Sequence, residues 1–268
     1  MTIAAGTVLL GTVALEPNRW ATVDPSGAPR TILSKWLDRI AEAGFDGIEL
    51  WERHATADEA EAAAILAGPL PVTVWSSYAS FDDADAAGRE QVVDWVGRAG
   101  SRGVKFNVGS DLAQLDRYAA RLSSWVERLP HQAVALCECH AGTSVAEQPE
   151  VAAALFDAAG PIDRVQAIVH THESREHLTA RFDAYGERIT HVHVNHLDPA
   201  TGRAPRLADR AAELTATAVH LRSLGFRGSW TIEFVEGTLT EHDEPTHLLE
   251  QAAQDLRVLR QIVAEVFA

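Results

Sequence analysis

Eight short apolar runs alternate with segments of helical period along the 268 residues of the chain. Each run has the length of a β-strand and is rich in Val, Ile and Leu. Runs of this kind are typical of strands that are buried on both faces of a parallel sheet. The expected strands are Val8–Ala14, Gly47–Trp51, Val72–Ser76, Val104–Val108, Ala133–Glu138, Val165–His170, Ile189–Asn195 and Trp230–Phe234.

The order of these segments favours a single (β/α)8 TIM barrel over residues 1–268, for which this length is typical. Gly44-Phe45-Asp46-Gly47 and Gly225-Phe226-Arg227-Gly228 each end a helical segment and lead into a strand. A repeated helix–strand unit fits a barrel better than an open sheet. A doubly wound open sheet is the alternative, but Gly11-Thr12-Val13-Ala14 is not the Gly-rich phosphate loop that such a sheet normally carries after its first strand.

Composition excludes several classes of partner. The net charge is −15, and no basic stripe of the kind that binds nucleic acid is present. No stretch reaches the ~20 apolar residues of a membrane-spanning helix. The apolar run Ile3–Leu15 has no basic residue before it, so we interpret it as a first strand and not as a targeting segment. Cys137 and Cys139 are interpreted as buried thiols of a cytoplasmic protein.

Polar residues collect where the fifth to eighth expected strands end. The carboxyl ends of the strands form the active face of a barrel, so these residues are expected to lie together. Six of the twelve histidines belong to this set. Its members are Glu138, His140, His170, His172, His191, His193, His196 and Glu233.

Their spacing predicts a metal site. Glu138 and His140 share one strand face, as do His191, His193 and Asn195. A carboxylate buried in a barrel mouth must be paired, protonated or bound to metal, and the chain has only two lysines to pair with. Mixed carboxylate and imidazole donors favour one divalent ion, Mn²⁺ as first choice, with Zn²⁺, Co²⁺ or Fe²⁺ before Mg²⁺.

The chain resembles the xylose isomerase-like TIM barrels, a superfamily of sugar phosphate isomerases and epimerases, sugar dehydratases and AP endonucleases of the endonuclease IV type. Four sequence segments carry the resemblance, and they occur in the order of the family's second, fifth, seventh and eighth strands. They are Gly44–Leu50, Leu136–Thr143 with its Glu-x-His and Gly-Thr, His191–His193, and Trp230–Glu233.

The resemblance implies Glu138, His193 and Glu233 as metal ligands. The family's Asp on the sixth strand is replaced by His170, which we expect as the fourth ligand, with His172 as its competitor. The family's Lys-Asp after the seventh-strand histidine is replaced by Asn195-His196.

Other polar residues near strand ends are candidates for substrate contact. Lys105 shares a strand face with Asn107 and could point into the barrel or reach out to solvent. His191 lies two residues before His193 on the same strand face, and we expect it to hydrogen-bond to a metal ligand or to be a core histidine. The candidates for substrate contact are Glu49, His54, His140, Lys105, Asn107, His172 and Asn195.

Together these features predict a metal-dependent isomerase or epimerase of a small keto-sugar or related polyol. Glu138 and Glu233 would move a proton next to the carbonyl through a metal-stabilised enediolate. A lyase of the same family, such as a sugar or polyol dehydratase, is the alternative because it begins with the same step. A non-catalytic sugar-binding subunit and an endonuclease IV-like nuclease are less favoured, since the nuclease would need a three-metal cluster and the opposite charge. Assembly into a homo-oligomer is left open.

Overall fold

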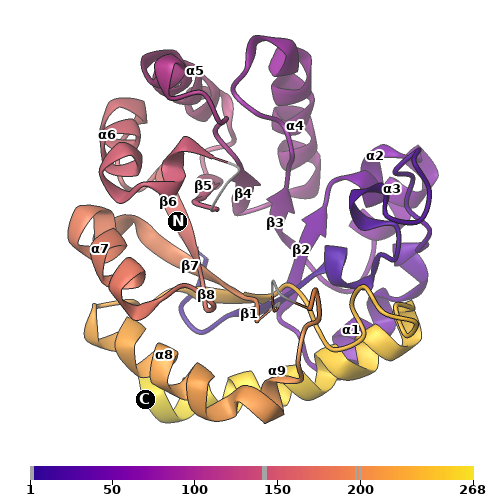
Figure 1. Cartoon of the computed structure of the whole chain (residues 1–268). Helices are drawn as coiled ribbons and strands as arrows, with labels where there is room; N and C mark the ends of the chain where they lie inside the picture. The colour runs from indigo at the N-terminus through magenta and orange to yellow at the C-terminus, as the bar shows by residue number, and fades with distance from the viewer. Residues whose placement is uncertain (1–2, 141–143, 197, 199–200) are drawn as a thin grey trace.

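Eight parallel strands close into a barrel in which each strand pairs with the next and β8 pairs with β1 (Figure 1). The computed structural model describes residues 3–140, 144–196, 198 and 201–268. The strands are β1 (Val8–Gly11), β2 (Gly47–Trp51), β3 (Val72–Ser76), β4 (Gly103–Phe106), β5 (Val134–Glu138), β6 (Val165–His170), β7 (Ile189–Val194) and β8 (Ser229–Ile232). The predicted (β/α)8 architecture is confirmed.

Helices follow the strands and form an outer ring around the barrel (Figure 1). Two α-helices follow β2, and one α-helix follows each of the other strands. The helices are α1 (Leu37–Ala43), α2 (Arg53–Thr56), α3 (Glu59–Leu66), α4 (Ala86–Ala99), α5 (Leu115–Arg128), α6 (Pro149–Ala159), α7 (Arg175–Tyr185), α8 (Ala211–Ser223) and α9 (Pro245–Phe267). No helix among the described residues is both long and apolar enough to span a membrane.

The two glycines of the repeated phrase end helices in the left-handed conformation. Gly44 has φ 98° after α1, and Gly225 has φ 97° shortly after α8. This conformation favours glycine because it has no Cβ to clash with the backbone. The recurrence seen in the sequence therefore marks equivalent turns before β2 and β8.

The barrel interior has an apolar floor and a polar mouth. Leu9, Val74, Leu136 and Ile168 belong to one small buried cluster inside the strands. Because side chains alternate along β5, Glu138 shares the face of Leu136, two residues nearer the carboxyl end. Cys137 and Cys139 lie on the opposite face, in the larger core shared with the helices, and both thiols are free.

Strand ends account for the differences from the predicted boundaries. The first strand stops at Gly11, and Thr12–Leu15 forms the 3₁₀ helix η1. The Thr12 hydroxyl there accepts a hydrogen bond from the backbone N–H of Trp51, which ties this turn to the end of β2. The eighth strand stops at Ile232, so Glu233 lies in the loop just beyond it. Ala141–Thr143, which carries the Gly-Thr of the fifth-strand phrase, lies outside the described residues.

Candidate metal centre

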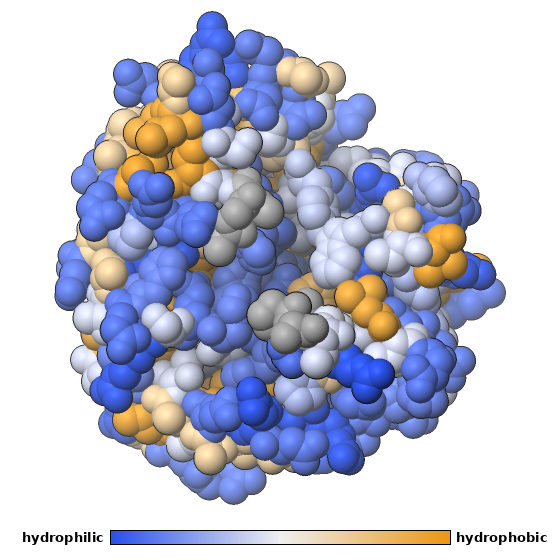
Figure 2. All heavy atoms as spheres, in the orientation of Figure 1, coloured by the Kyte–Doolittle hydropathy of each residue, from blue (hydrophilic) through white to orange (hydrophobic). Residues whose placement is uncertain are grey.

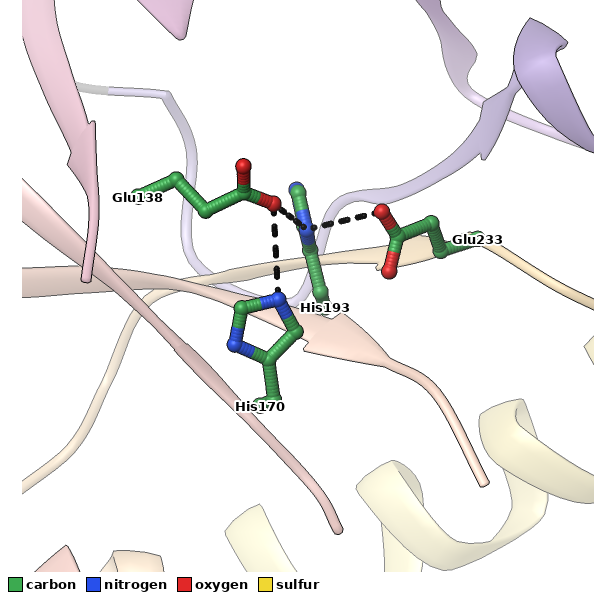
Figure 3. A group of neighbouring side chains, drawn as sticks. All are labelled: Glu138, His170, His193 and Glu233. Atoms are coloured by element: carbon green, nitrogen blue, oxygen red, sulfur yellow. Dashed lines mark ion pairs between the residues drawn. The ribbon is translucent and has the colours of Figure 1, made fainter. Parts of the chain in front are cut away.

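Four side chains from neighbouring strands converge in the mouth of the barrel (Figure 3). Glu138 ends β5, His170 ends β6, His193 lies on β7 and Glu233 follows β8. Each offers one ligand atom, and these four atoms lie within 4.8 Å of one another. His193 Nδ1 lies 3.3 Å from Glu138 Oε1 and 3.6 Å from Glu233 Oε1. His170 Nε2 lies 3.4 Å from the same Glu138 oxygen.

Two ring nitrogens face this group without a hydrogen-bond partner among the described residues. They are His170 Nε2 and His193 Nδ1, and both are buried. A buried polar atom without a partner is costly, so native structures rarely keep one without a reason. Two imidazole lone pairs beside two carboxylate oxygens form a donor set that suits a borderline divalent cation. The residues therefore fit the metal that the sequence predicts.

A carboxylate behind His193 fixes which of its nitrogens carries the proton. His193 Nε2 lies 3.1 Å from Glu49 Oε2, and the Thr231 hydroxyl donates to the same oxygen at 2.9 Å. His191 Nε2 lies 3.5 Å from it. With the Nε2 proton donated to Glu49, the Nδ1 lone pair points into the four-residue group. The structure thus places Glu49, which is 4% exposed, against His193 on the side away from the four-residue group.

A second carboxylate supports His170. The backbone N–H of His170 donates to Glu173 Oε1 at 2.9 Å, and its Nδ1 lies 3.7 Å from the same atom. Arg181, fully buried on α7, donates from Nε to Glu173 Oε2 at 2.6 Å and from a terminal nitrogen to the Cys139 carbonyl at 2.6 Å. Its other terminal nitrogen donates to the Tyr185 hydroxyl at 2.7 Å. Arg181 therefore links the ends of β5 and β6, which carry Glu138 and His170.

The two oxygens of Glu138 have different surroundings. Lys105 Nζ donates to Oε2 at 2.7 Å, and the Asn107 amide donates to it at 3.2 Å. Oε1 faces the two histidines. Lys105 is 4% exposed, so of its two predicted orientations the structure shows the one that points into the barrel.

The polar residues after β6 and β7 form the rim of the barrel mouth. Asn195 Nδ2 donates to Glu233 Oε2 at 3.0 Å. His172 is exposed, its Nδ1 lies 3.2 Å from the Asn195 carbonyl, and its ring centroid is 5.1 Å from that of His170. Although part of the residue reaches solvent, desolvation of the imidazole, followed by the charge of His170, lowers the pKa of His172 to about 4. His140 places its ring centroid 5.4 Å from that of His170. The geometry therefore assigns His170 to the four-residue group and the other two histidines to its surroundings.

His54, another candidate for substrate contact, is not part of the four-residue group. It is 2% exposed on α2, and its Nε2 lies 3.3 Å from Glu16 Oε2 in the loop after β1. The edge of its ring meets Trp51 at 5.2 Å between centroids. The structure ties this histidine to Glu16 and does not bring it to the four-residue group.

When no cation is bound, the surrounding charges favour an ionised Glu138 and an additional proton on His170 and on His193. Burial opposes ionisation of Glu138, but Lys105 beside it holds the pKa of that carboxyl well below its usual range. Burial likewise opposes protonation of His170, yet its contact with Glu138 contributes to raising its pKa to about 9. Against the same effect of burial, Glu49 raises the pKa of His193 well above its usual range. A divalent ion would therefore replace protons on both rings.

Three residues near the site were missed by the sequence reasoning. Glu173 and Arg181 were not predicted as a pair, because nothing in a spacing of eight residues across a strand end and a helix marks them as partners. Tyr78 lies two residues beyond β3, and its ring centroid is 5.0 Å from Lys105 Nζ. The rule that found the other candidates, a polar side chain just after a strand, also applies to Tyr78.

Solved structures with similar folds identify the architecture. A xylose isomerase-like TIM barrel/4-hydroxyphenylpyruvate dioxygenase fusion protein superimposes with a TM-score of 0.65 at 16% identity, covering 98% of this chain and 44% of the fusion protein. A xylose isomerase domain protein from Alicyclobacillus acidocaldarius subsp. acidocaldarius gives 0.64 at 16% identity, covering 96% of this chain and 99% of its own. The fold is that of the xylose isomerase-like TIM barrels.

A third structure, that of the IOLI protein with a binding zinc atom, gives a TM-score of 0.62 at 11% identity and covers 98% of this chain and 99% of its own. The fold also occurs in proteins described as the probable 3-DHS dehydratase AsbF, a sugar phosphate isomerase/epimerase and an AP endonuclease, family 2. At such identities the likeness shows the fold alone. No protein-family model matches the sequence, and a search of curated proteins gave no match.

Proposed function

We propose that this chain is a divalent-metal-dependent isomerase or epimerase of a small keto-sugar or related polyol. One observation carries the proposal. Two buried imidazole nitrogens without hydrogen-bond partners among the described residues face two carboxylates within 4.8 Å at the mouth of a xylose isomerase-like barrel. The metal ligands are Glu138, His170, His193 and Glu233, and Mn²⁺ is the first choice, followed by Zn²⁺, Co²⁺ and Fe²⁺.

Glu233 is the better placed of the two carboxylates to act as the base. Its side chain is 14% exposed against 8% for Glu138. Its second oxygen accepts from the neutral amide of Asn195, whereas that of Glu138 is held by the Lys105 cation. A carboxylate paired with a cation accepts a proton less readily than one beside an amide. Glu233 therefore removes the proton from the carbon next to the substrate carbonyl.

Glu138 and Glu233 approach His193 from opposite sides (Figure 3). The electron pair of the broken C–H bond becomes the double bond of an enediolate. Return of the proton to the neighbouring carbon gives an isomer, and return to the same carbon from the opposite face, on the side of Glu138, gives an epimer. A bound divalent ion would polarise the carbonyl group and so acidify the adjacent C–H bond. The remaining Nζ protons of Lys105 can hydrogen-bond a substrate oxygen.

A lyase is the second candidate because its first step is the same. The enediolate would then expel a neighbouring hydroxyl group, which leaves as water after it takes up a proton. Lys105 is a buried cation beside Glu138. It favours this candidate because a cation can stabilise the oxygen of the hydroxyl group that leaves.

A nuclease and a non-catalytic binding protein have less support. A second set of possible ligands, Glu49, His191 and His193, shares His193 with the first, and its Glu49 already accepts from Thr231. Among the described residues this geometry supports one ion and not a cluster. A net charge of −15 also opposes a DNA substrate.

The test is proton exchange with solvent. The manganese-loaded protein is incubated in heavy water with a panel of ketoses, and the carbon next to each carbonyl is followed by NMR. The proposal expects deuterium at that carbon in at least one ketose, and removal of the metal with EDTA should abolish the exchange. Product formed without any deuterium would point to a hydride shift or to hydrolysis by a metal-activated water.

A further inference from the structure

A buried arginine lies behind two of the four expected metal ligands. Arg181 is fully buried, although the face of the barrel that carries the mouth is mostly hydrophilic (Figure 2). Its Nε donates to Glu173 Oε2 at 2.6 Å, its Nη1 to the Tyr185 hydroxyl at 2.7 Å and its Nη2 to the Cys139 carbonyl at 2.6 Å. A charged side chain is almost never fully buried unless it is paired. Here all three guanidinium nitrogens have partners, so the position of the group is fixed.

The partners of Arg181 belong to the segments that carry Glu138 and His170. Cys139 is the residue after Glu138, and Glu173 is three residues after His170. One guanidinium group therefore sets the distance between the ends of β5 and β6. A buried ion pair is weak evidence of stability, because well-packed apolar residues of similar volume often serve as well. The location of this pair behind two ligands therefore needs a reason other than stability.

The two ring nitrogens of His170 face different carboxylates. Nε2 lies 3.4 Å from Glu138 Oε1, and Nδ1 lies 3.7 Å from Glu173 Oε1. Figure 3 shows one ring nitrogen pointing into the four-residue group and the other pointing away from it. The backbone N–H of His170 also donates to Glu173 Oε1 at 2.9 Å, which holds that oxygen beside the ring. A carboxylate on the Nδ1 side favours the tautomer that carries its proton there, and so leaves the Nε2 lone pair for a metal.

His193 shows the same arrangement with its two nitrogens exchanged. Its Nδ1 faces the four-residue group, and its Nε2 lies 3.1 Å from Glu49 Oε2. Each of the two expected imidazole ligands thus has a carboxylate on its far side. The two carboxylates differ in what holds them, because Glu49 accepts from the Thr231 hydroxyl and Glu173 accepts from the Arg181 cation. The position of Glu173 therefore depends on Arg181.

A carboxylate in the position of Glu173 has opposite effects on different ligands. Behind an imidazole it holds the proton of the outer nitrogen and makes the inner nitrogen a better donor. An aspartate in place of His170 would instead put three carboxylates side by side, because Glu138 and Glu173 lie on either side of that position. Like charges at such distances repel one another. Glu173 is therefore favourable behind a histidine and unfavourable behind an aspartate.

We propose that Glu173 and Arg181 are positioning residues, which direct His170 Nε2 into the metal centre and hold the ends of β5 and β6 at the spacing that the centre requires. Arg181 acts through Glu173, and Glu173 acts through His170. This inference rests on the metal centre of the proposed function and does not depend on which reaction the centre performs.

The test is a double-mutant cycle that is read as zinc affinity and needs no turnover. Competition with a chromophoric chelator gives the affinity of the parent protein, Glu173→Gln, His170→Asp and the double variant. Glutamine can still accept from the backbone N–H of His170, but it carries no charge. Glu16→Gln is the matched control, because Glu16 is fully buried and its Oε2 lies 3.3 Å from His54, a histidine outside the centre.

Glu173→Gln should weaken zinc binding about 10- to 100-fold, the usual effect of removing a group that orients a metal ligand. The same substitution in His170→Asp should weaken zinc binding no further, or should strengthen it, because the repulsion between two carboxylates is removed. Glu16→Gln should bind zinc as the parent protein does. The visible absorption of bound Co²⁺, which reports the ligands around the ion, should change in Glu173→Gln and stay the same in Glu16→Gln.

Arg181→Lys tests the other half of the pair. Lysine keeps the positive charge, but it lacks the planar fork that donates in three directions at once. The variant should therefore lose part of the zinc affinity and alter the Co²⁺ spectrum in the same sense as Glu173→Gln. It also carries the test if Glu173→Gln fails to fold, which circular dichroism would show.

Parental zinc affinity in Glu173→Gln, or in Arg181→Lys with an unchanged Co²⁺ spectrum, would overturn the inference. So would an equal loss of affinity from Glu173→Gln in the parent protein and in His170→Asp, because Glu173 would then act on the fold and not on the imidazole ring.

Failure of the proposed function has a different signature. If no ketose exchanges its proton while the cycle shows the expected coupling, the positioning pair stands and the catalytic proposal falls. If exchange occurs and Glu173→Gln keeps parental zinc affinity, the reverse holds.

Discussion

Lys105 Nζ lies 2.7 Å from Glu138 Oε2, while the other oxygen of Glu138 faces His170 and His193. The Glu138 carboxylate thus lies between the Lys105 ammonium group and the expected position of the metal ion. The second oxygen of Glu233 accepts instead from the neutral Asn195 amide. This asymmetry distinguishes the two glutamates chemically although both are close to His193.

Removal of the Lys105 cation should destabilise the metal-free protein. Lys105→Met leaves the buried Glu138 charge without its nearest partner, and breaking a buried pair in this way typically costs about 3–5 kcal/mol of unfolding free energy. Urea denaturation in EDTA measures the change. Lys35→Met is the matched control, because Lys35 is the other lysine of the chain and is exposed. Equal stability of the two variants would show that Lys105 and Glu138 are not coupled.

Replacement of either glutamate should stop turnover without unfolding the barrel. Glu138→Gln and Glu233→Gln each remove a charge from the group, and loss of a positioned acid or base typically costs at least ~100-fold in rate. Exchange of substrate hydrogen with heavy water should be lost most completely in Glu233→Gln, because Glu233 is the proposed base. Circular dichroism checks the fold. Near-parental exchange in Glu233→Gln would assign the base elsewhere.

His170, the last residue of β6, and His172, two residues beyond it, should differ in their effect on metal content. His170→Ala removes a nitrogen that faces the group, whereas His172→Ala removes a ring on the rim. Elemental analysis of dialysed protein should therefore show a much larger loss of metal for His170→Ala. His170→Asp should keep a site and shift its preference toward harder metals. The opposite ranking of the two alanine variants would make His172 the ligand.

The stability of the metal-free protein should fall as pH rises. Contacts with Glu138 and Glu173, acting against burial, raise the pKa of His170 from 6.5 to about 9. A raised pKa means that the folded state holds the proton more tightly, so this contribution is full below pH 6.5 and is lost as pH rises through about 9. Denaturation in EDTA at pH 6, 7.5 and 9 measures this trend.

Zinc should reverse that trend, because the ion competes with the same protons and gains affinity as they leave. The matched control is His170→Gln, which cannot carry the proton and should weaken the dependence in EDTA, leaving the part that His193 contributes. A metal-free protein whose stability rises over this range would contradict the pairing of His170 with the two carboxylates.

The fold could be predicted closely because its strands are nearly continuous apolar runs. The predicted bounds Gly47–Trp51, Val72–Ser76 and Val165–His170 agree with β2, β3 and β6. The first and eighth strands were predicted to end too late, because the chain after Gly11 forms a 3₁₀ helix and Phe234 is buried outside the sheet. Hydrophobicity marks burial but does not distinguish a strand from the buried turn that follows it.

The sequence predicted the site residues that lie at or just after strand ends. It did not predict the residues on other elements that hold those side chains in place. Glu138, His170, His193 and Glu233 were predicted as a group, and the structure brings them together. Arg181 approaches from a helix, and no spacing reveals which way its side chain turns. Arg19 and Asp243 form a buried ion pair although they are 224 positions apart, so their spacing in the sequence does not reveal the contact.

The most direct test of the account is anomalous diffraction from crystals soaked in Mn²⁺ or Zn²⁺. The account predicts one strong peak per chain, within bonding distance of Glu138, His170, His193 and Glu233. A mouth without a peak, or a peak held by other side chains while these four remain unligated, would contradict it.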